Sequence, residues 1–542
     1  MENISSNTPN FHLTVKNYRC FPDNKPVHIS MRNGFTAFVG VNNSGKSSLL
    51  KMFYELRNLF ALLSNPNNFL NALKNPNDQE FSPANTIQDI NEICCNANSR
   101  DIYLEIKLNA GLNNKQNDGV LPEKIVLIIR RGRTGFTPQI FLPDNKYLDI
   151  KKPNIPSKVI NNVHIKVEDT LVDLEAYLQI FKALSGTVYI GPFRNAVNIG
   201  SKENYYDMTI GQKFIELWRS HKSGNTIADI VAALRLTHDL QDIFRFKNLE
   251  INASTDNQTL HVIVDGKPYR LEELGSGLAQ FIVILANIAI KKPSWILIDE
   301  PELNLHPSLQ IAFLTTLASY ATEGIIFSTH NIGLARASAD CIYSFHTDEE
   351  GQNEVKDFET IPRLSEFLGE LSYAGYKDIG SRKVLLVEGS SEVRTIQQFL
   401  RKYGKDHKIV LLSLGGNDLI KPSSSIELEE IKRITDGNIS ALIDSERKSS
   451  DDALCADRQA FFNNCKEAHI NCRILERRAI ENYFSDRAIK VIKGEKYQAL
   501  NPYEKLGETS PSWGKQENWR IAREMNLEEI NNTDLGKFLL SL

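Results

Sequence analysis

The chain has 542 residues, of which 41% are hydrophobic and 24% are charged, and such values are typical of a globular protein with about two to four domains. The formal net charge of −4 argues against a chain that coats nucleic acid by bulk charge, although a local basic groove is compatible with it. No apolar run is long enough to cross a bilayer, and Met1 to Asn10 lacks the features of a secretion signal. The seven cysteines show no CxxC spacing, so we expect free thiols and a cytoplasmic location.

Residues 40–47 have the sequence Gly-Val-Asn-Asn-Ser-Gly-Lys-Ser, which is the pattern of a phosphate-binding loop. The apolar run Phe35 to Val39 predicts a strand before the loop, and Ser48 to Phe60 predicts a helix after it. The glycines let backbone N–H groups face one anion, and the helix adds its positive N-terminal end. Lys46 is predicted to contact the β- and γ-phosphates of a nucleotide, and the Ser47 hydroxyl to bind Mg²⁺. The predicted nucleotide-binding residues here are Gly40, Asn42, Asn43, Ser44, Gly45, Lys46, Ser47 and Ser48.

The segments around this loop alternate between predicted strands and predicted helices. Residues 65–100 are rich in Asn and interrupted by Pro, which favours an insertion that is mobile or contacts a partner. The cluster Arg130-Arg131-Gly132-Arg133 suits a solvated hairpin turn better than a phosphate contact. Periodicity predicts strands at Phe11 to Val15, His28 to Met31, Asp101 to Leu108, Lys124 to Arg130 and Thr187 to Ile190, a hairpin over 245–265, and helices at Glu168 to Leu184 and Gln212 to Leu236.

An acidic pair follows another buried-strand pattern, Ser294 to Ile298. Of this pair, Asp299 is the candidate for binding Mg²⁺, and Glu300 is the candidate for orienting or deprotonating an attacking water. The turn over residues 274–277, Leu-Gly-Ser-Gly, opens a very apolar helix in another anion-binding geometry. The apolar run Gly324 to Phe327 predicts a strand that continues into Ser-Thr-His. An ordinary capped loop would explain each pattern alone, but together they favour an NTPase.

This set of motifs resembles the ABC-type ATPase heads of chromosome-maintenance and DNA-repair proteins. The resemblance implies that Ser276 and Gly277 form a signature motif that completes the nucleotide site of a second subunit, and that His330 is the switch histidine. It also implies ATP with Mg²⁺ as the ligand. The signature differs from the usual Leu-Ser-Gly-Gly, and the Leu-Gly-Ser-Gly variant resembles the OLD (overcoming lysogenization defect) ATPases. Gln79 and Gln88 are both candidates for the Q-loop glutamine.

A second α/β pattern begins after a polar segment at 346–381, which predicts a linker. Because the carboxyl ends of parallel strands meet at one edge of a sheet, acids that follow such strands are expected to cluster. A single acid of this kind is usually solvated, but divalent cations best relieve the repulsion within a cluster, and all-oxygen ligation favours Mg²⁺ or Mn²⁺ over zinc. The predicted strands are Lys383 to Val387, Lys408 to Leu412 and Ser440 to Ile443, and they end in Glu388, in Gly415-Gly416, and in Asp444 and Glu446, respectively.

This order of strands and acids resembles a Toprim domain, the metal-dependent phosphoryl-transfer fold of topoisomerases, primases and OLD nucleases. The family usually shows Asp-x-Asp, whereas here the second acid is Glu446, whose side chain reaches further. The resemblance implies that an acid in the stretch Arg473 to Phe484 binds a second metal, and Glu481 is favoured over Glu476. It also implies a lysine that stabilises the transition state, for which Lys515 is the candidate.

We therefore predict an α/β protein with an ABC-type P-loop ATPase domain at 1–345, inserted helical and dimerisation elements at approximately 60–185, a linker at 346–381 and a Toprim (Rossmann-like) domain at 382–542. The predicted function is that of an OLD-type endonuclease that hydrolyses ATP and cuts DNA with Mg²⁺ or Mn²⁺. The resemblance implies antiviral defence, a defence-system partner such as a protein or a retron's DNA, and a homodimer or larger assembly through the ATPase heads, without membrane contact. Two alternatives stay open. One is a non-cutting DNA-repair ATPase whose Toprim acids bind metal structurally, and the other is an ATPase whose Toprim unit senses a nucleotide or RNA.

Overall fold

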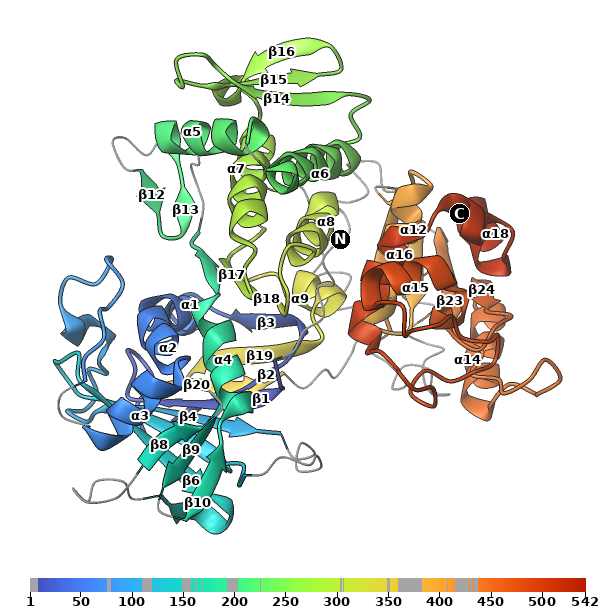
Figure 1. The fold of residues 1–542 in the computed structure, drawn as a ribbon. Helices are drawn as coiled ribbons and strands as arrows, with labels where there is room; N and C mark the ends of the chain where they lie inside the picture. The colour runs from blue at the N-terminus through green and yellow to red at the C-terminus, as the bar shows by residue number, and fades with distance from the viewer. Residues whose placement is uncertain are drawn as a thin grey trace.

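The computed structural model shows two α/β units that lie side by side (Figure 1). No helix in the described part of the chain is both long and apolar enough to cross a membrane. The structure describes residues 8–75, 79–109, 119–148, 157–160, 163–167, 169–192, 203–224, 226–302, 305, 307–348, 351–358, 383–406, 408–414, 428, 432 and 437–542.

The first unit is built around a central six-stranded sheet that carries the phosphate loop. Five strands are parallel, and β20 pairs antiparallel at one edge. The inner strands β17 and β18 are buried along their whole length, which is why their sequences are continuous apolar runs. In sheet order the strands are β11 (Val188–Ile190), β17 (Trp295–Asp299), β18 (Gly324–Thr329), β3 (Gly34–Gly40), β19 (Cys341–Thr347) and β20 (Asn353–Asp357). The four strands predicted in these regions are confirmed.

Helices connect and cover these strands (Figure 1). The predicted helix Ser48 to Phe60 is present, but it is divided at Leu56 between α1 and α2. Helix α7 is buried over most of its surface because its sequence is apolar on nearly every side. The helices of this unit are α1 (Lys46–Glu55), α2 (Arg57–Leu63), α3 (Pro66–Lys74), α4 (Glu175–Ser185), α5 (Gly211–Lys222), α6 (Ile227–Phe244), α7 (Ser276–Lys291), α8 (Pro307–Ala318) and α9 (Ile332–Ser338).

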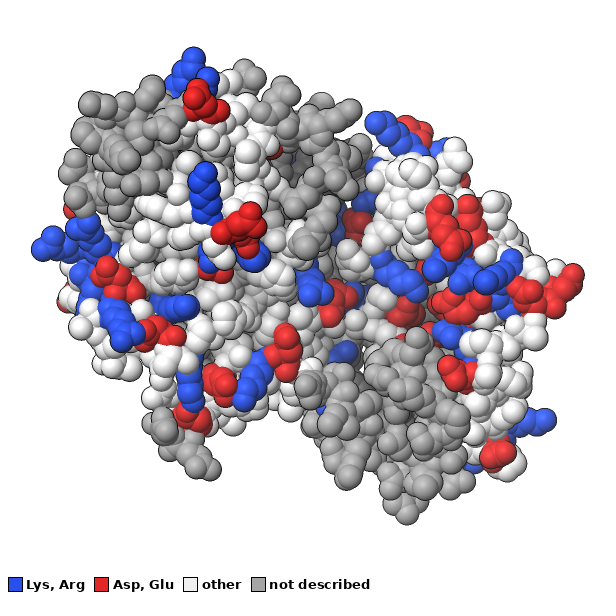
Figure 2. Space-filling model, turned by 90° about the horizontal axis from the view of Figure 1, so that it is seen from below, with Lys and Arg blue, Asp and Glu red and all other residues white. Residues whose placement is uncertain are grey.

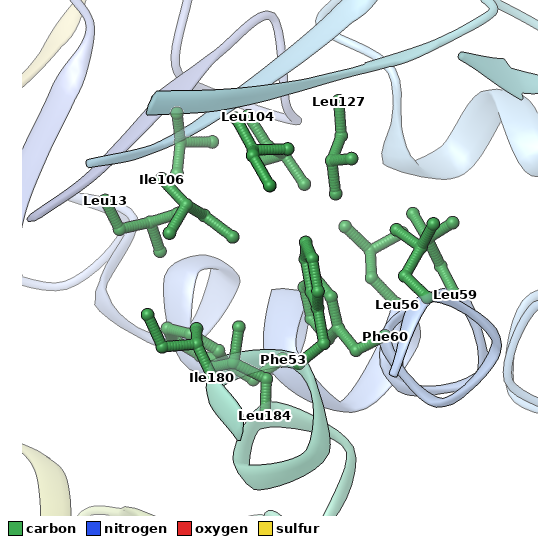
Figure 3. Close-up of a cluster of buried hydrophobic side chains, with 14 of the residues drawn as sticks. Leu13, Phe53, Leu56, Leu59, Phe60, Leu104, Ile106, Leu127, Ile180 and Leu184 are labelled. Atoms are coloured by element: carbon green, nitrogen blue, oxygen red, sulfur yellow. The ribbon is translucent and has the colours of Figure 1, made fainter. Parts of the chain in front are cut away.

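An antiparallel sheet packs against α1, α2 and α4 to form a hydrophobic core (Figure 3). Its strands alternate buried and less buried residues, as expected for a sheet with one solvated face. Leu104 and Leu127 point from the sheet toward Phe53 and Phe60 on the helices (Figure 3). In sheet order the strands are β2 (Val27–Met31), β1 (Phe11–Lys16), β4 (Ile102–Leu108), β5 (Lys124–Ile129), β6 (Phe136–Leu142) and β7 (Lys146–Tyr147). The strand pairs predicted from the sequence are confirmed.

The described part of residues 65–100 does not form a mobile insertion. Helix α3 and the short 3-10 helix η1 (Ile90–Ile93) bury Phe69 and Ile93 in the same core. Asn65 caps α3 through its side chain, so the Asn-rich composition reflects helix capping as well as loops.

Two predicted helices have different limits. The helix expected from Glu168 begins only at Glu175, because residues 170–173 form a strand. The helix expected over Gln212 to Leu236 is divided into α5 and α6, and the Thr226 hydroxyl caps α6 by accepting a hydrogen bond from the Asp229 N–H at 3.2 Å. The remaining strands of this unit are β8 (Ser157–Ile160), β9 (His164–Val167), β10 (Thr170–Asp173), β12 (Asn204–Tyr205), β13 (Met208–Thr209), β14 (Leu249–Ala253), β15 (Leu260–Val264) and β16 (Lys267–Arg270).

The second unit contains a four-stranded parallel sheet covered by helices. The three strands predicted here are confirmed, whereas Gly415-Gly416 lies outside the described residues. The predicted linker at 346–381 overlaps β20, which belongs to the first sheet, and its residues 359–381 also lie outside the described ranges. In sheet order the strands are β22 (Ile409–Ser413), β21 (Lys383–Val387), β23 (Ile439–Ile443) and β24 (Asn471–Ile474), and the helices are α12 (Ser390–Lys402), α14 (Ala456–Glu467), α15 (Asp486–Lys493), α16 (Asn518–Glu524), α17 (Leu527–Asn531) and α18 (Asp534–Ser541).

Truncation of Phe60 tests the core between the antiparallel sheet and the helices. Phe60 is 1% exposed and stacks on Phe181 with ring centroids 6.5 Å apart. We expect Phe60→Ala to lower the free energy of unfolding by about 3–5 kcal/mol because it leaves a cavity, and a fall in the thermal midpoint would show this. Leu540→Ala, on an α18 residue that is 59% exposed, is the control and should change the midpoint little. Equal midpoints for the two variants would contradict the assignment of this core.

Candidate nucleotide site and acidic cluster

The phosphate loop has no room for side chains at its two glycines. A Cβ atom at Gly40 would lie 2.3 Å from the backbone oxygen of Phe345, and one at Gly45 would lie 2.6 Å from the Phe21 ring. Gly45 also has a φ of 100°, which disfavours other residues. Helix α1 begins at the next residue, so the unpaired N–H groups of its first turn lie beside the loop. This local geometry suits an anion.

Lys46 is the cation of this loop and is only 5% exposed. Its Nζ donates to the carbonyl oxygens of Gly40 and Val41, both at 2.8 Å. Burial lowers the pKa of Lys46, whereas the carboxylate of Asp299 and those of two nearby glutamates raise it. Lys46 therefore lies within electrostatic reach of the acidic end of β17.

The other predicted loop residues take different positions. The Ser44 hydroxyl is buried and donates to a carbonyl within the loop at 2.8 Å, which stabilises the turn. Asn42 and Asn43 are exposed, while Ser47 and Ser48 are half-buried in the first turn of α1. Within the described ranges no side chain or carbonyl bonds to the Ser47 hydroxyl, so it is available to a ligand.

Asp299 ends β17 and is 2% exposed. Its carboxylate accepts hydrogen bonds from the Ser328 hydroxyl of the neighbouring strand and from the Tyr189 hydroxyl, the latter at 3.3 Å. Burial and the charge of Asp299 raise the pKa of Tyr189, so this phenol stays a donor. Two hydroxyl donors thus orient the Asp299 carboxylate.

Glu300 and His330 lie together at the same edge of the sheet. His330 Nε2 is 3.3 Å from Glu300 Oε1. Glu300 has a φ of 53°, a left-handed conformation that is uncommon for a residue with a side chain, and its N–H donates to the Ser328 carbonyl at 3.1 Å. The structure therefore brings together Glu300, the candidate for orienting the attacking water, and His330, the candidate switch histidine.

Glu302 is a further residue of this site that the sequence analysis did not identify. Its carboxylate accepts hydrogen bonds from the Thr329 hydroxyl at 2.7 Å and from the His330 N–H at 3.0 Å, and burial raises its pKa. It thereby fixes the segment that presents His330. In the sequence, the feature that could have indicated Glu302 is its position as a third acid, two residues after Glu300.

The signature residues lie apart from this edge. Ser276 and Gly277 are the first two residues of α7, and Ser276 is exposed. No hydrogen bond between described residues joins Ser276 to the phosphate loop. Of the two Q-loop candidates, Gln79 accepts a hydrogen bond from the Phe136 N–H through its backbone at 3.3 Å, and Gln88 is exposed.

The second unit brings Glu388 and Asp444 together at the carboxyl edge of its sheet. The Asp444 N–H donates to Glu388 Oε1 at 2.7 Å. Arg458 from α14 joins them, because its Nη2 donates to Glu388 Oε2 at 2.9 Å and its Nε donates to the Asp444 carbonyl at 2.8 Å. Glu388 is thus fixed by a peptide N–H on one oxygen and a guanidinium on the other.

Asp444 lies at the centre of an acidic cluster and is 4% exposed. Burial, followed by the charges of Glu388, Glu392 and Glu481, raises the pKa of Asp444 well above its usual value of 3.8. Burial also raises the pKa of Glu388 and of Glu481. The Ile480 N–H donates to Asp444 Oδ1 at 3.1 Å. The cluster therefore concentrates negative charge in a region that water barely reaches.

Lys515 and Glu481 form an ion pair beside Asp444. Lys515 Nζ is 3.5 Å from Glu481 Oε1, and Glu481 is 3% exposed. Burial lowers the pKa of Lys515, but the nearby carboxylates, of which Glu481 has the largest effect, raise this pKa above its usual value. Glu476, the alternative to Glu481, has a side chain that is 70% exposed and pairs with Arg473. The structure thus brings Glu481 and Lys515, rather than Glu476, to the cluster.

Glu392 was missed in the sequence, and Glu446 lies differently from the other acids. Glu392 is 8% exposed in the first turn of α12, four residues after Glu388, a spacing that could have indicated it. Its Oε2 is 2.8 Å from the position of a Cβ on Gly389, so the carboxylate lies against the residue that follows Glu388. Glu446 accepts a hydrogen bond from Arg478 Nη2 at 2.6 Å, which neutralises its charge.

The acidic cluster suits a divalent cation by its chemistry more than by its present spacing. Across the part of the chain that the structure describes, no three His, Cys, Asp or Glu side chains converge closely enough to hold a metal ion. Nevertheless, three acids of the cluster are more than nine-tenths buried: Glu392, Asp444 and Glu481. The fourth, Glu388, is held by the backbone N–H of Asp444. The pKa is raised for Glu388, Asp444 and Glu481. Oxygen-only donors fit Mg²⁺ or Mn²⁺, although Arg458 and Lys515 already offset part of the repulsion among these acids. Glu446 fits less well because Arg478 already occupies it.

Comparison with known proteins identifies the first unit. Residues 166–336, which include β17, β18 and α7, match the family model described as "AAA domain, putative AbiEii toxin, Type IV TA system". Together with the phosphate loop, this match identifies the first unit as an α/β P-loop ATPase domain. None of the curated proteins compared with the chain matches it.

Among solved structures, the chain is similar to SMC head domains. One is the SMC head domain from Thermotoga maritima, with 15% identity over 65% of this chain and 100% of that chain and a TM-score of 0.31. A second is the SmcHead bound to the C-winged helix domain of ScpA, with 14% identity, coverage of 65% and 97%, and a TM-score of 0.35. A third is the Smc head domain with an extended coiled coil, bound to the C-terminal domain of ScpA derived from Pyrococcus furiosus, with 12% identity, coverage of 67% and 98%, and a TM-score of 0.33.

The charge of Asp444 should make the second unit less stable as the pH rises. Because the pKa of Asp444 is raised, its protonated form stabilises the folded chain at low pH, and this contribution is lost as the pH rises through the raised value. Without divalent cations, Asp444→Asn should therefore raise the thermal midpoint at pH 8 by roughly 2–4 °C for each kcal/mol of repulsion removed. The gain should disappear toward pH 4. Glu476→Gln, at an exposed acid of the same unit, is the control, and an Asn variant that is less stable than wild type at pH 8 would contradict the expected repulsion.

Proposed function

We propose that this chain is an ATP-hydrolysing, Mg²⁺- or Mn²⁺-dependent DNA endonuclease of the OLD type. The observation that carries the proposal is the buried cluster of carboxylates at the carboxyl edge of the second sheet, on the same chain as an ATPase unit. Burying several carboxylates together costs free energy unless a cation compensates them. Phosphodiester cleavage is a reaction for which cations bound by carboxylates are suited. The resemblance to OLD proteins adds the proposed role in antiviral defence and a defence-system partner, either a protein or a retron's DNA.

In the ATPase unit, the phosphate loop and Lys46 bind the triphosphate of ATP, and Ser47 and Asp299 are the proposed Mg²⁺ ligands. Glu300 orients the attacking water and takes its proton. His330, with Nε2 3.3 Å from the Glu300 carboxylate, keeps that carboxylate in place. The Tyr189 and Ser328 hydroxyls restrict the rotation of Asp299.

In the second unit, Glu388, Asp444 and Glu481 are the proposed metal ligands, with Glu446 as a weaker one. Bound Mg²⁺ or Mn²⁺ would supply an activated water and stabilise the leaving oxygen of the phosphodiester. Lys515 remains cationic because of its raised pKa, and it stabilises negative charge on the phosphate in the transition state. Burial of Asp444 and Glu481 excludes bulk water, which strengthens these electrostatic effects.

We also propose a homodimer or larger assembly through the ATPase heads. Helix α6 exposes an apolar stripe at helical spacing, whose residues are from 40% to 81% exposed: Ile227, Ile230, Val231 and Leu234. Such a stripe on one helix face is typical of a protein contact. In a dimer of this kind, the exposed Ser276 and the half-buried Gly277 would reach the nucleotide of the second subunit.

DNA binding is expected to depend on local groups. On the face shown in Figure 2, the described basic and acidic side chains are interspersed, which agrees with the formal net charge of −4. Contacts with the DNA backbone are therefore expected from individual arginines, such as Arg447 and Arg477, whose backbones bond to Ser445 beside Asp444, rather than from a continuous basic surface.

A second candidate function is supported by the arginines that already pair with the acids. Arg458 lies on Glu388 and Arg478 lies on Glu446, so two of the proposed ligands are neutralised without a metal. This arrangement favours a non-cutting ATPase whose acids are structural. Cleavage of plasmid DNA in the presence of Mg²⁺ or Mn²⁺ distinguishes the two functions.

Two substitutions should separate ATP binding from ATP hydrolysis. Lys46→Ala should weaken ATP binding at least about tenfold because the phosphates lose the cation of the loop. Glu300→Gln should leave binding within about twofold and reduce hydrolysis by about 100-fold or more, because it removes the base but keeps the shape. Binding of a fluorescent ATP analogue and release of phosphate measure the two effects. Glu354→Gln, at an acid on the edge strand β20, is the control, and equal hydrolysis by the Glu300 variant and wild type would refute the role of Glu300.

The nuclease is tested by replacing the central acid of the cluster. Asp444→Ala should abolish plasmid cleavage with Mg²⁺ or Mn²⁺ and leave ATP hydrolysis within about twofold of wild type, because the ATPase residues lie in the other unit. Glu476→Ala is the matched control, since Glu476 is an exposed acid in the same unit and should cut normally. Undiminished cleavage by the Asp444 variant would exclude the cluster as the nuclease centre.

A further inference from the structure

Two helices of the second unit lie between the acidic cluster and the ATPase unit. Helices α12 and α16 are on the side of the second unit that faces α8 and α9 (Figure 1). On each helix, one residue lies at the acidic cluster, and a residue close to it in the sequence contacts the ATPase unit. The acidic cluster is therefore not an isolated module of the second unit.

On α12, these residues are Glu392 and Arg394. Arg394 is completely buried, and its guanidinium donates to the Ser338 carbonyl and to Asp340 of the ATPase unit. It also lies over the Phe35 ring, 4.5 Å from the ring centroid. Because a buried charge must stay paired, this contact fixes the first turn of α12, which contains Glu392.

On α16, the corresponding residues are the neighbours Asn518 and Trp519. Asn518 Nδ2 is 3.5 Å from Glu481 Oε2. The Trp519 ring packs edge-on against Phe35 with centroids 6.0 Å apart and is part of the core of the ATPase unit. Next to it, Arg520 donates to the Ala318 carbonyl at the end of α8 at 2.7 Å.

Phe35 is thus one ATPase residue that both helices contact. It is 1% exposed and lies at the start of β3, whose other end, Gly40, begins the phosphate loop. Its N–H donates to Asp340 at 2.9 Å, and Asp340 also pairs with Arg394. One small cluster of side chains therefore anchors both helices to the strand that leads to the nucleotide site.

We propose that Arg394, Trp519 and Phe35 are positioning residues for the acidic cluster: by anchoring α12 and α16 to the ATPase unit, they keep Glu392 and Glu481 turned toward Asp444. The like charges of these acids favour separation, and helices fixed at their far side resist it. The affinity of the cluster for a divalent cation then depends on a residue of the ATPase unit. This inference rests on the proposed metal-binding function of the cluster.

The test is a titration of the full chain with Mn²⁺, without nucleotide, followed by the electron paramagnetic resonance signal of free Mn²⁺. Binding that is lost in Asp444→Ala defines the cluster site. Phe35→Leu and Arg394→Met should each weaken that binding about tenfold, as outer-shell changes at metal sites do. The double variant should be little weaker than either single one, because both changes release the same anchor. Arg394→Lys keeps the charge but loses the forked geometry, so its effect should be intermediate.

Arg245→Ala is the matched control. Arg245 also joins the two units, through hydrogen bonds to the Gly404 carbonyl and to Asp406, but neither partner is next to an acid of the cluster. This variant should bind Mn²⁺ within about twofold of wild type, which shows that loss of an interface contact alone is insufficient. Wild-type Mn²⁺ binding by Phe35→Leu would overturn the inference and leave the proposed function intact. Absence of any Asp444-dependent binding in the wild type would overturn both.

Discussion

The parallel pairing of strands is the constraint on which both candidate sites depend. In the first sheet, Asp299 lies opposite Ser328, and Thr329 lies opposite Val39, so the acidic pair, His330 and the phosphate loop emerge at one edge. In the second sheet, β21 and β23 pair in the same direction, and the two acids that follow them meet. A slip of one residue would turn every side chain of a strand to the opposite face. Because these strands are buried on both faces, the polar residues at their ends oppose such a slip, which would draw them into the apolar core.

The two sites differ in how their buried carboxylates are stabilised. In the nucleotide site, the buried Asp299 is satisfied by two hydroxyl donors, and the buried cation Lys46 lies near it. Glu300 and Glu302 lie at the same edge, so acids outnumber this lysine there. In the acidic cluster, several carboxylates share the cations Lys515 and Arg458. Burial, followed by the charges of the neighbouring acids, raises the pKa of Asp444. The buried carboxylate of the first site thus has hydrogen-bond partners within the fold, whereas protonation, basic side chains or a bound cation must offset the burial of the acids in the second.

Motifs that are contiguous in the chain were predictable, while residues that depend on packing were not. The glycine loop and the strands before Asp299 and Asp444 follow from local sequence, and the structure has them. Glu302, in a turn, and Glu392, in a first helical turn, were not predicted because acids at such positions are ordinarily solvated. Only the tertiary structure shows that burial raises the pKa of Glu302 and leaves Glu392 8% exposed. The pairing of Glu446 with Arg478 likewise joins residues 32 positions apart. No local pattern encodes a contact of that kind.

The arginine on Glu388 bears directly on the difference between a metal-binding and a structural acidic cluster. Glu388 Oε1 is fixed by the Asp444 N–H, while Oε2 is engaged only by Arg458 among the described hydrogen bonds. A carboxylate oxygen has two lone pairs, so Oε2 can accept from Arg458 and ligate a cation at the same time. The two positive charges would repel each other at that distance, so withdrawal of Arg458 would favour metal binding. Its second contact, to the Asp444 carbonyl, can persist during such a movement because it uses a different nitrogen. The Arg458–Glu388 pair is therefore one of the interactions against which a cation would compete at this cluster, beside Arg478 on Glu446 and Lys515 on Glu481.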